Sequence, residues 1–210
     1  MVLLFMGVLS LILGLQFSRS ESPVQKFGGP LRIVGIILLV IGASTSMFKV
    51  IDAGQVGVKT LFGKVENDVL YSGLNAINPL VEVTTFDTKT QNYTMSGVHD
   101  EGDKAGDDAI RVLSADGLEV IIDLSVLYKV QATEAPRILK EIGKDYTDKI
   151  VRPVSRTAIR DNAVYYDAVA LYSTKRQEFQ DKIYKSISES FAKRGLVLEQ
   201  LLVRNITLPE

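Results

Sequence analysis

The chain has 210 residues, of which 46% are apolar, and its formal net charge is −1. This near balance excludes the basic face that nucleic acids require, so no nucleic-acid partner is expected. There is no cysteine and only one histidine, His99, so thiolate nucleophiles and Cys-based metal sites are excluded and we expect no catalytic, cofactor-binding or metal-binding residues.

Two apolar runs occupy the beginning of the chain. Residues 1–17 contain no charged side chain, and residues 31–49 contain only Arg32 and Lys49, near the ends of the run. A membrane-crossing helix needs about 17–25 mostly apolar residues. The pattern therefore predicts a membrane anchor at residues 1–49, a hairpin of two short transmembrane helices. A cleaved signal peptide is the alternative for the first run, although no basic residue precedes it as such peptides require.

The loop between the two runs, residues 18–30, is basic. Arg19 and Lys26 lie within it and Arg32 lies at its edge. The positive-inside rule places such a loop in the cytoplasm, which puts the remainder of the chain on the other side of the membrane. We therefore expect an integral membrane protein of a bacterial cell membrane or a mitochondrial inner membrane, with an extracytoplasmic soluble domain at residues 50–210.

The first part of that domain is rich in strand signals. Residues 50–65 alternate apolar and polar side chains with the period of a strand, and residues 81–95 are rich in Val, Thr, Phe and Tyr. Between them, residues 71–79 hold glycine, asparagine and proline and are predicted as loop and turn. Residues 96–109 are acidic with almost no apolar side chain, which is typical of a solvated surface insertion. A calcium site there is the alternative, but the spacing of a known calcium loop is absent.

The clearest strand covers residues 118–130. Alternate side chains from Leu118 to Val130 are apolar, so one face of the strand should be buried in an antiparallel sheet. Asp116-Gly117 just before it is a hairpin signal, which predicts that residues 110–113 pair back against the strand.

Helical periodicity follows. We expect a short helix at residues 134–142 ended by Gly143, a second from Asp145 that restarts at Pro153, and a third capped by Ser173 and ended by Gly195. A last strand covers residues 196–208. The third helix carries one apolar stripe, expected to pack on the face of the 118–130 strand: Phe179, Ile183, Ile187 and Phe191. Strands followed by helices and one closing strand predict an α+β domain, an antiparallel sheet with helices packed on it.

Three arginines recur every four residues in the second helix: Arg152, Arg156 and Arg160. They share one helical face, which is most simply a solvated surface. The alternative is a subunit interface, in which this rim pairs with acids such as Asp161 or Glu178 of a neighbouring copy.

Several segments, taken together and in this order, resemble the prohibitin/stomatin/flotillin (band 7) domain family. They are AGQVGVKTLFGKV at 53–65, GLNAINPL at 73–80, SADGLEVIIDLSVLYKV at 114–130, IVRPVSRTAIRDN at 150–162, LYSTKRQEFQDKI at 171–183 and RGLVLEQLLVRNITLP at 194–209. The resemblance implies a non-enzymatic membrane scaffold that forms homo-oligomeric rings or cages, organises membrane microdomains and regulates a membrane-bound AAA protease. It also implies a coiled-coil helix after the final strand, which would begin where this chain ends and is expected to be missing here.

Two other functions are compatible with the sequence. One is a monomeric regulatory module that binds a membrane protease without forming rings. The other is a membrane-anchored hydrolase that uses one of the many serines, although no nucleophile–base pairing is visible in the sequence.

Overall fold

The structure is a computed structural model that describes residues 2–19, 28–99 and 101–208. The chain divides into two compact units. The first contains Met1–Asp52 and Tyr71–Glu82, and the second contains Ala53–Leu70 and Val83–Glu210. Residues 20–27 of the basic loop that decides the predicted topology, Lys26 among them, lie outside the described residues.

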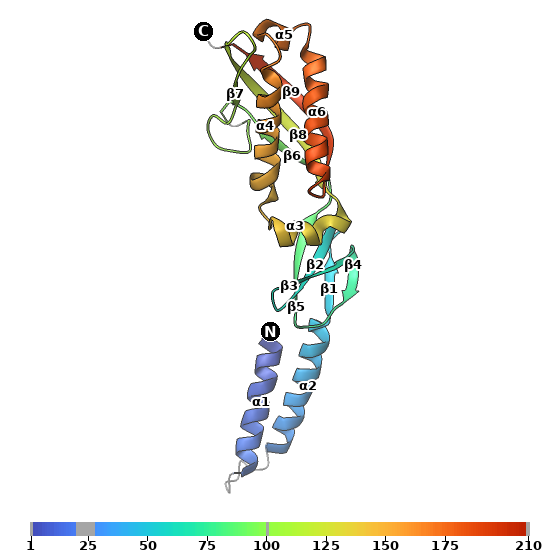
Figure 1. Cartoon of the computed structure of the whole chain (residues 1–210). Helices are drawn as coiled ribbons and strands as arrows, with labels where there is room; N and C mark the ends of the chain where they lie inside the picture. The colour runs from blue at the N-terminus through green and yellow to red at the C-terminus, as the bar shows by residue number, and fades with distance from the viewer. Residues whose placement is uncertain (1, 20–27, 100, 209–210) are drawn as a thin grey trace. The chain divides into compact units, whose positions relative to one another are not determined.

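The first unit begins with two helices, α1 (Val2–Arg19) and α2 (Gly28–Ser46), which pack against each other as the predicted hairpin (Figure 1). Glycines allow the close approach: a Cβ on Gly35 would lie 2.9 Å from Leu11 Cγ, and a Cβ on Gly7 would lie 2.9 Å from Leu39 Cγ. Ser10 Oγ also donates a hydrogen bond to Leu31 O, at 2.9 Å. Small residues at a helix–helix contact allow the two backbones to approach this closely.

The predicted membrane spans are not confirmed. No helix in the described part of the chain combines the length and the apolarity that a membrane crossing requires.

A two-stranded antiparallel sheet completes the first unit. β1 (Phe48–Ile51) pairs with β4 (Gly73–Ala76). The prediction that residues 71–79 are loop is therefore wrong for β4. The strand is short and holds glycine and asparagine, and its partner lies more than twenty residues earlier, so backbone pairing decides its conformation and local propensity does not.

The second unit contains a three-stranded sheet in the order β3-β2-β5, built from β2 (Gln55–Leu61), β3 (Lys64–Leu70) and β5 (Val81–Asp87), whose first two residues belong to the first unit. The predicted strand at residues 50–65 is thus divided among β1, β2 and the start of β3. The turn between β2 and β3 has left-handed backbone at both Phe62 (φ 48°) and Gly63 (φ 82°).

The larger sheet of this unit is antiparallel throughout, with β8 (Glu119–Val130) at its centre. β6 (Gln91–Met95) and β7 (Ile110–Leu113) pair with successive parts of β8, and β9 (Leu196–Thr207) pairs with it over nearly its full length. The predicted alternation is confirmed from Val120 to Val130, where every second side chain is buried, and is wrong for Leu118, which lies before β8 and is exposed. The predicted hairpin at Gly117 is confirmed as well.

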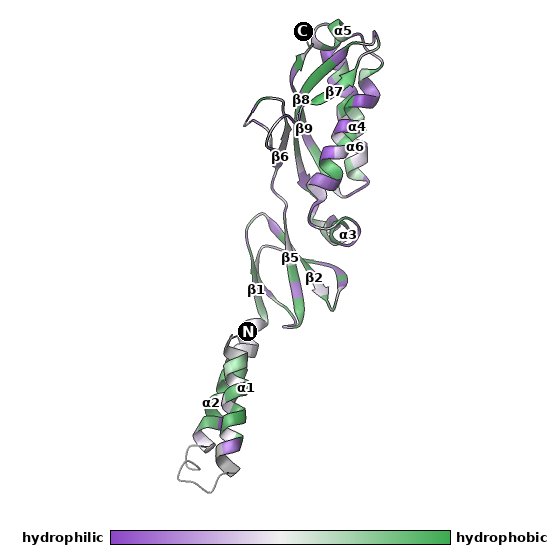
Figure 2. Cartoon of the chain, turned by 90° about the vertical axis from the view of Figure 1, so that its left-hand side faces the viewer, coloured by the Kyte–Doolittle hydropathy of each residue, from purple (hydrophilic) through white to green (hydrophobic). Residues whose placement is uncertain are grey.

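Helices cover one face of this sheet (Figure 2). They are listed in chain order: a π-helical turn (Thr147–Val151) that runs into α4 (Arg152–Ala163), α5 (Ala168–Tyr172) and α6 (Arg176–Ala192). The preceding helix α3 (Ala135–Glu141) packs instead on β2 and β3 of the three-stranded sheet. The stripe of α6 is fully buried as predicted, and the ring of Phe191 meets the ring of Tyr128 on β8 edge-on, with centroids 6.2 Å apart. The α+β class is therefore confirmed.

The predicted start of the third helix is wrong. Ser173 does not cap α6; its hydroxyl donates to Val169 O at 2.6 Å and so closes the short helix α5, which the sequence reading missed. The helix start predicted at Pro153 is confirmed, since this proline lies in the first turn of α4.

Candidate functional site: an acidic loop held by two arginines

The acidic segment between β6 and β7, residues 96–109, folds back onto the sheet. Asp103 Oδ2 accepts a hydrogen bond from Thr94 N at 2.5 Å, and Asp123 Oδ1 accepts one from Gly97 N at 3.0 Å. Beneath the loop, the hydroxyls of Thr94 and Ser125 lie 2.9 Å apart. The loop is thus attached to the sheet by the carboxylate of Asp103, within the loop, and by the carboxylate of Asp123 on β8. The loop covers Asp123, which explains why this side chain is buried on the polar face of β8.

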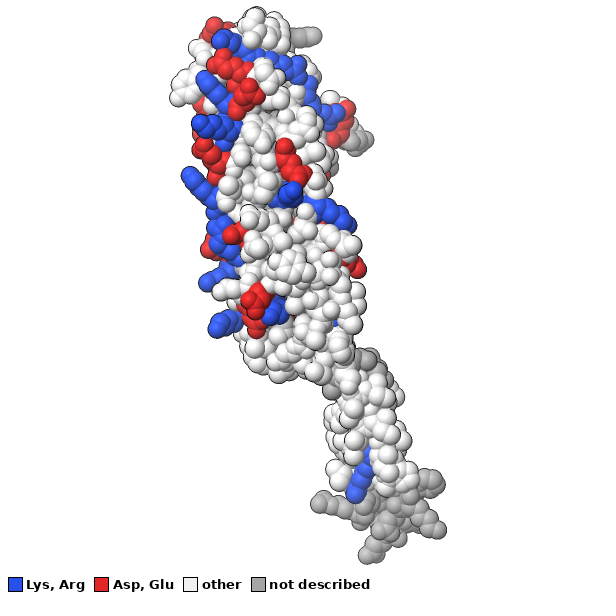
Figure 3. Space-filling model, turned by 90° about the vertical axis from the view of Figure 1, so that its right-hand side faces the viewer, with Lys and Arg blue, Asp and Glu red and all other residues white. Residues whose placement is uncertain are grey.

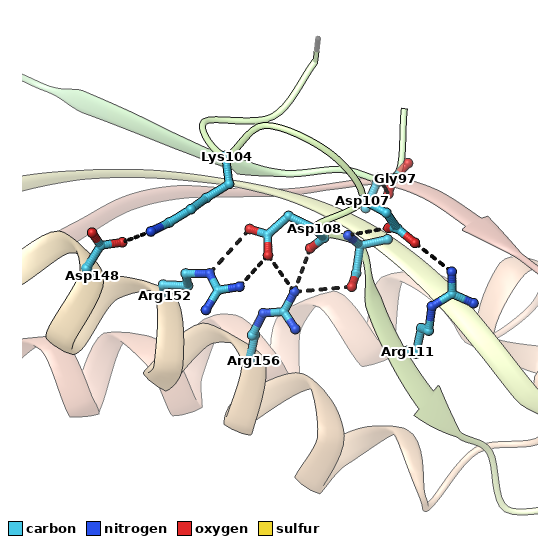
Figure 4. Close-up of polar contacts among 10 residues, drawn as sticks. Gly97, Lys104, Asp107, Asp108, Arg111, Asp148, Arg152 and Arg156 are labelled. Atoms are coloured by element: carbon cyan, nitrogen blue, oxygen red, sulfur yellow. Dashed lines mark hydrogen bonds and ion pairs between the residues drawn. The ribbon is translucent and has the colours of Figure 1, made fainter. Parts of the chain in front are cut away.

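Asp108, at the end of the loop, is the most buried carboxylate of the segment, with 4% of its surface exposed. Arg152 and Arg156, one turn apart on α4, both bond to it (Figure 4). Arg156 Nη2 donates to Asp108 Oδ1 at 2.8 Å and to Asp108 O at 2.7 Å, and Arg152 Nε donates to Asp108 Oδ2 at 3.3 Å. We call Asp108, Arg152 and Arg156 the arginine clamp.

In the arginine clamp two guanidinium groups face one carboxylate, and the carboxylate of Asp108 and the adjacent Tyr93 are buried. The hydrogen bond to Asp108 raises the pKa of Arg152. The neighbouring Tyr93 is buried, and desolvation raises the pKa of its hydroxyl. Tyr93 Oη and Arg156 Nε are buried without a hydrogen-bond partner in the described structure. The cluster is built to fix the loop on α4, because a buried carboxylate is stable only when charged partners replace its water.

Outer charged side chains of the loop, of both signs, pair with charged side chains outside it. Asp107 contacts Arg111 at 2.6 Å, and that hydrogen bond lowers the pKa of the Asp107 carboxyl. Lys104 Nζ lies 2.8 Å from Asp148. Across the described ranges, no three histidine, aspartate or glutamate side chains gather in a way that could hold a metal ion.

The predicted arginine rim is divided by the fold. Arg152 and Arg156 point to Asp108 of their own chain, whereas Arg160 is exposed. Of the acids suggested as partners, Asp161 lines a groove of about 410 Å³ between α4 and α6. Glu178 bonds to Lys175 at 2.8 Å, which together with Tyr166 and Lys182 lowers the pKa of its carboxyl to about 2. The sequence reading missed Asp108, because nothing in the helical spacing points to a partner 44 residues earlier.

A hydroxyl–carboxylate pair at the turn between β7 and β8 bears on the hydrolase alternative. Ser114 Oγ donates to Asp116 Oδ1 at 2.5 Å and to Leu118 O at 2.9 Å. The first bond lowers the pKa of Asp116, which makes this carboxylate a weaker base. Asp116 Oδ1 also accepts from Ala168 N at 3.1 Å, so the pair closes a turn and holds α5 in place.

An exposed apolar surface lies beside this turn. The bond from Ala115 N to Tyr166 O, 2.8 Å long, brings the turn against the segment that joins α4 to α5. Tyr165 is 75% exposed, the most of any side chain on this surface. We call this surface the apolar tip; it consists of Leu113, Leu118, Val164, Tyr165, Val169 and Tyr172. Exposed apolar side chains in such number at one end of a domain are typical of a protein–protein contact.

Comparison with known proteins assigns the family. The profile of the SPFH domain / Band 7 family matches residues 49–210. Mitochondrial prohibitin complex protein 1 of Caenorhabditis elegans is 24% identical over 186 residues, which cover 87% of this chain and 62% of that protein. Prohibitin 1 of Gallus gallus is 23% identical over 186 residues, 88% of this chain and 61% of that protein. The chain thus spans less than two thirds of the length of these relatives. The predicted resemblance is confirmed, and this chain belongs to the SPFH domain / Band 7 family.

Proposed function

We propose that the protein is a non-enzymatic scaffold, held at a lipid membrane by the α1–α2 hairpin, that self-associates into ring- or cage-like assemblies and organises membrane proteins. Membership in the SPFH/band 7 family supports the scaffold role. The observation that carries the proposal is the surface of the hairpin, whose outward side chains are apolar.

The hairpin buries little of its apolar surface within the chain. Phe5, Ile33 and Val40 are among the exposed apolar side chains of α1 and α2. The face of the hairpin visible in Figure 3 is almost free of charge, in contrast to the second unit. A helix pair that is apolar on its outside is unfavourable in water and stable in an apolar phase, so the hairpin suits a bilayer.

Membrane attachment is the first expected result. The full chain should sediment with membranes and remain there after alkaline carbonate washing, because apolar contact is insensitive to charge. A variant that lacks residues 1–46 should move to the supernatant. Release of the full chain by carbonate would contradict the proposal.

Topology is a separate expectation. We propose that the loop at residues 18–30 faces the cytoplasm and that the remainder of the chain is extracytoplasmic, on the strength of Arg19, Lys26 and Arg32. Reporter fusions after Glu210 should be active with a reporter that works outside the cytoplasm. Activity of a cytoplasmic reporter alone would contradict this topology. Charge reversal at Arg19 and Lys26 should lower the activity of the extracytoplasmic reporter, because it removes the basic residues that hold the loop in the cytoplasm.

Self-association is proposed to use the apolar tip, with the exposed Arg160 at the same end of α4 as a charged neighbour. Tyr165→Asp should reduce the size of assemblies of the detergent-solubilised protein, because it places a charge on the most exposed side chain of an apolar contact. Negative-stain imaging and sedimentation would measure the change. Tyr184→Asp, at a half-buried tyrosine on α6, serves as the control. If the wild-type chain is monomeric, the protein is a regulatory module and not a scaffold.

A membrane-bound AAA protease is the partner that we propose for the assembly. The family resemblance suggests it. Co-purification from solubilised membranes, with Tyr165→Asp as the comparison, would show whether a protease binds the assembly or the single chain.

A further inference from the structure

The turn between β2 and β3 carries an aromatic side chain at a position whose backbone favours other residues. Leu61 pairs with Lys64, so Phe62 and Gly63 form a two-residue hairpin loop, and both have positive φ. This is the pattern of a type I′ turn, whose first position favours asparagine, aspartate or glycine. A phenylalanine there brings its Cβ close to the following carbonyl oxygen, so the turn forms at a cost in stability.

The exposure of Phe62 is equally unfavourable. Its side chain is 84% exposed, the highest fraction among the large apolar side chains in the described part of the chain. Neither the turn nor the core therefore explains a phenylalanine at this position. An aromatic side chain that protrudes from a hairpin and contributes nothing to its own fold has the properties of an anchor, which is buried in contact with another molecule.

A groove of about 690 Å³ lies beside the turn, lined by residues of β3 and by Lys140 of α3. We call it the β3 groove. Pockets of about 300–1,000 Å³ hold whole small molecules, so the groove is large enough for the tip of a hairpin. Val65 is the apolar part of its lining and is partly buried.

The charges of the β3 groove favour an aromatic ring. Its two acids are already engaged, because Lys59 Nζ lies 2.7 Å from Glu66 and 3.6 Å from Asp68. Its two lysines, Lys64 and Lys140, have no ion-pair partner among the residues that the structure describes. An ammonium group is attracted to the face of an aromatic ring. The groove therefore offers both apolar contact and cation–π contact to a phenylalanine.

The chain thus carries an exposed aromatic anchor and, beside it, a groove that fits one and that its own Phe62 does not fill. We propose that Phe62 inserts into the β3 groove of a second copy. The charged side chains around the turn argue against burial of Phe62 among acyl chains. Anchor and groove also belong to one hairpin, so copies with the same orientation in one membrane present them at the same height. This inference rests on the proposed self-association, to which it adds a contact separate from the apolar tip.

Phe62→Asn separates a role in contact from a role in folding. Asparagine suits a type I′ turn, so the full-length variant should unfold at a higher urea concentration than the wild type. Its self-association should nevertheless weaken at least about tenfold, because the anchor is lost. Phe62→Tyr keeps the ring and should assemble as the wild type does. Urea denaturation followed by circular dichroism and sedimentation of the detergent-solubilised protein would measure the two effects.

Photochemical cross-linking would locate the contact. The full chain with p-benzoylphenylalanine in place of Phe62 would be reconstituted into phosphatidylcholine/phosphatidylglycerol vesicles and irradiated. A denaturing gel should show a product of twice the mass of the chain. Mass spectrometry of this product should place the link within residues 63–68 or at Lys140 of the second copy.

The outcomes distinguish this inference from the proposed function. A wild-type chain that is monomeric would overturn both. Assembly of Phe62→Asn equal to that of the wild type would overturn the inference alone and leave self-association to the apolar tip. A cross-link to lipid, to a different protein or to another part of the second copy would also overturn it. A lower urea midpoint for Phe62→Asn would show that the phenylalanine supports its own fold, which contradicts its role as an anchor.

Discussion

Phe191→Ala should lower the free energy of unfolding by about 3–5 kcal/mol, the usual cost of deleting a buried phenylalanine ring. Phe191 is fully buried and is the last member of the α6 stripe, where its ring contacts Tyr128 of β8. The substitution removes the apolar surface of the ring and leaves a cavity between the helix layer and the sheet. Urea denaturation of the solubilised chain, followed by circular dichroism, would measure the loss.

The matched control is Val169→Ala on α5. This side chain is exposed, and surface truncations usually change stability by less than about 0.5 kcal/mol. If Phe191→Ala and Val169→Ala unfold at the same urea concentration, α6 does not hold the helix layer on the sheet and the packing described above is wrong.

Asp108→Asn should be the next most damaging change, with an expected loss of about 3 kcal/mol. The substitution removes the negative charge that two guanidinium groups share and leaves Arg152 and Arg156 facing each other and an amide. Breaking a buried ion pair from one side is costly because the remaining charge has neither water nor a counter-ion. The exposure of Arg152, about one third of its side chain, limits the cost because water can reach that cation.

Two further variants make this prediction specific. Asp107→Asn removes the adjacent, exposed carboxylate and should cost at most about 1 kcal/mol. Arg152→Met added to Asp108→Asn should recover part of the loss, since one uncompensated cation disappears. If Asp107→Asn and Asp108→Asn cost the same, the arginine clamp is no more than a surface ion pair.

Features with strong local periodicity could be predicted from the sequence. The buried face of β8 was predictable because polar and apolar side chains alternate along it, and the α6 stripe because Phe179 and Phe191 continue one helical row. Gly117, Gly143 and Gly195 mark turns and helix ends, and each has the left-handed backbone that such positions need.

Features that depend on partners distant in the sequence could not be predicted. β4 is strand only because β1 supplies its hydrogen bonds, and its glycine and asparagine indicate a turn when they are considered alone. Ser173 has the chemistry of a helix cap, but a neighbouring carbonyl competes for its hydroxyl. The spacing of Arg152 and Arg156 indicates a charged helical face, and only the folded loop shows that this face is already neutralised by Asp108.

The pairing of β8 with β9 determines the order in which the larger sheet can form during synthesis. The end of β8 pairs with the start of β9, Val130 opposite Leu196, and the helices from α3 to α6 lie between these two strands in the sequence. During synthesis, more than sixty residues therefore separate the end of β8 from the start of β9, its third partner strand. Until β9 leaves the ribosome, one edge of β8 and its apolar face stay uncovered. Closing so long a loop is slow, since its entropy is lost before the contacts form. A nascent chain of this protein is thus most in need of chaperone protection after β8 has emerged and before β9 has been translated.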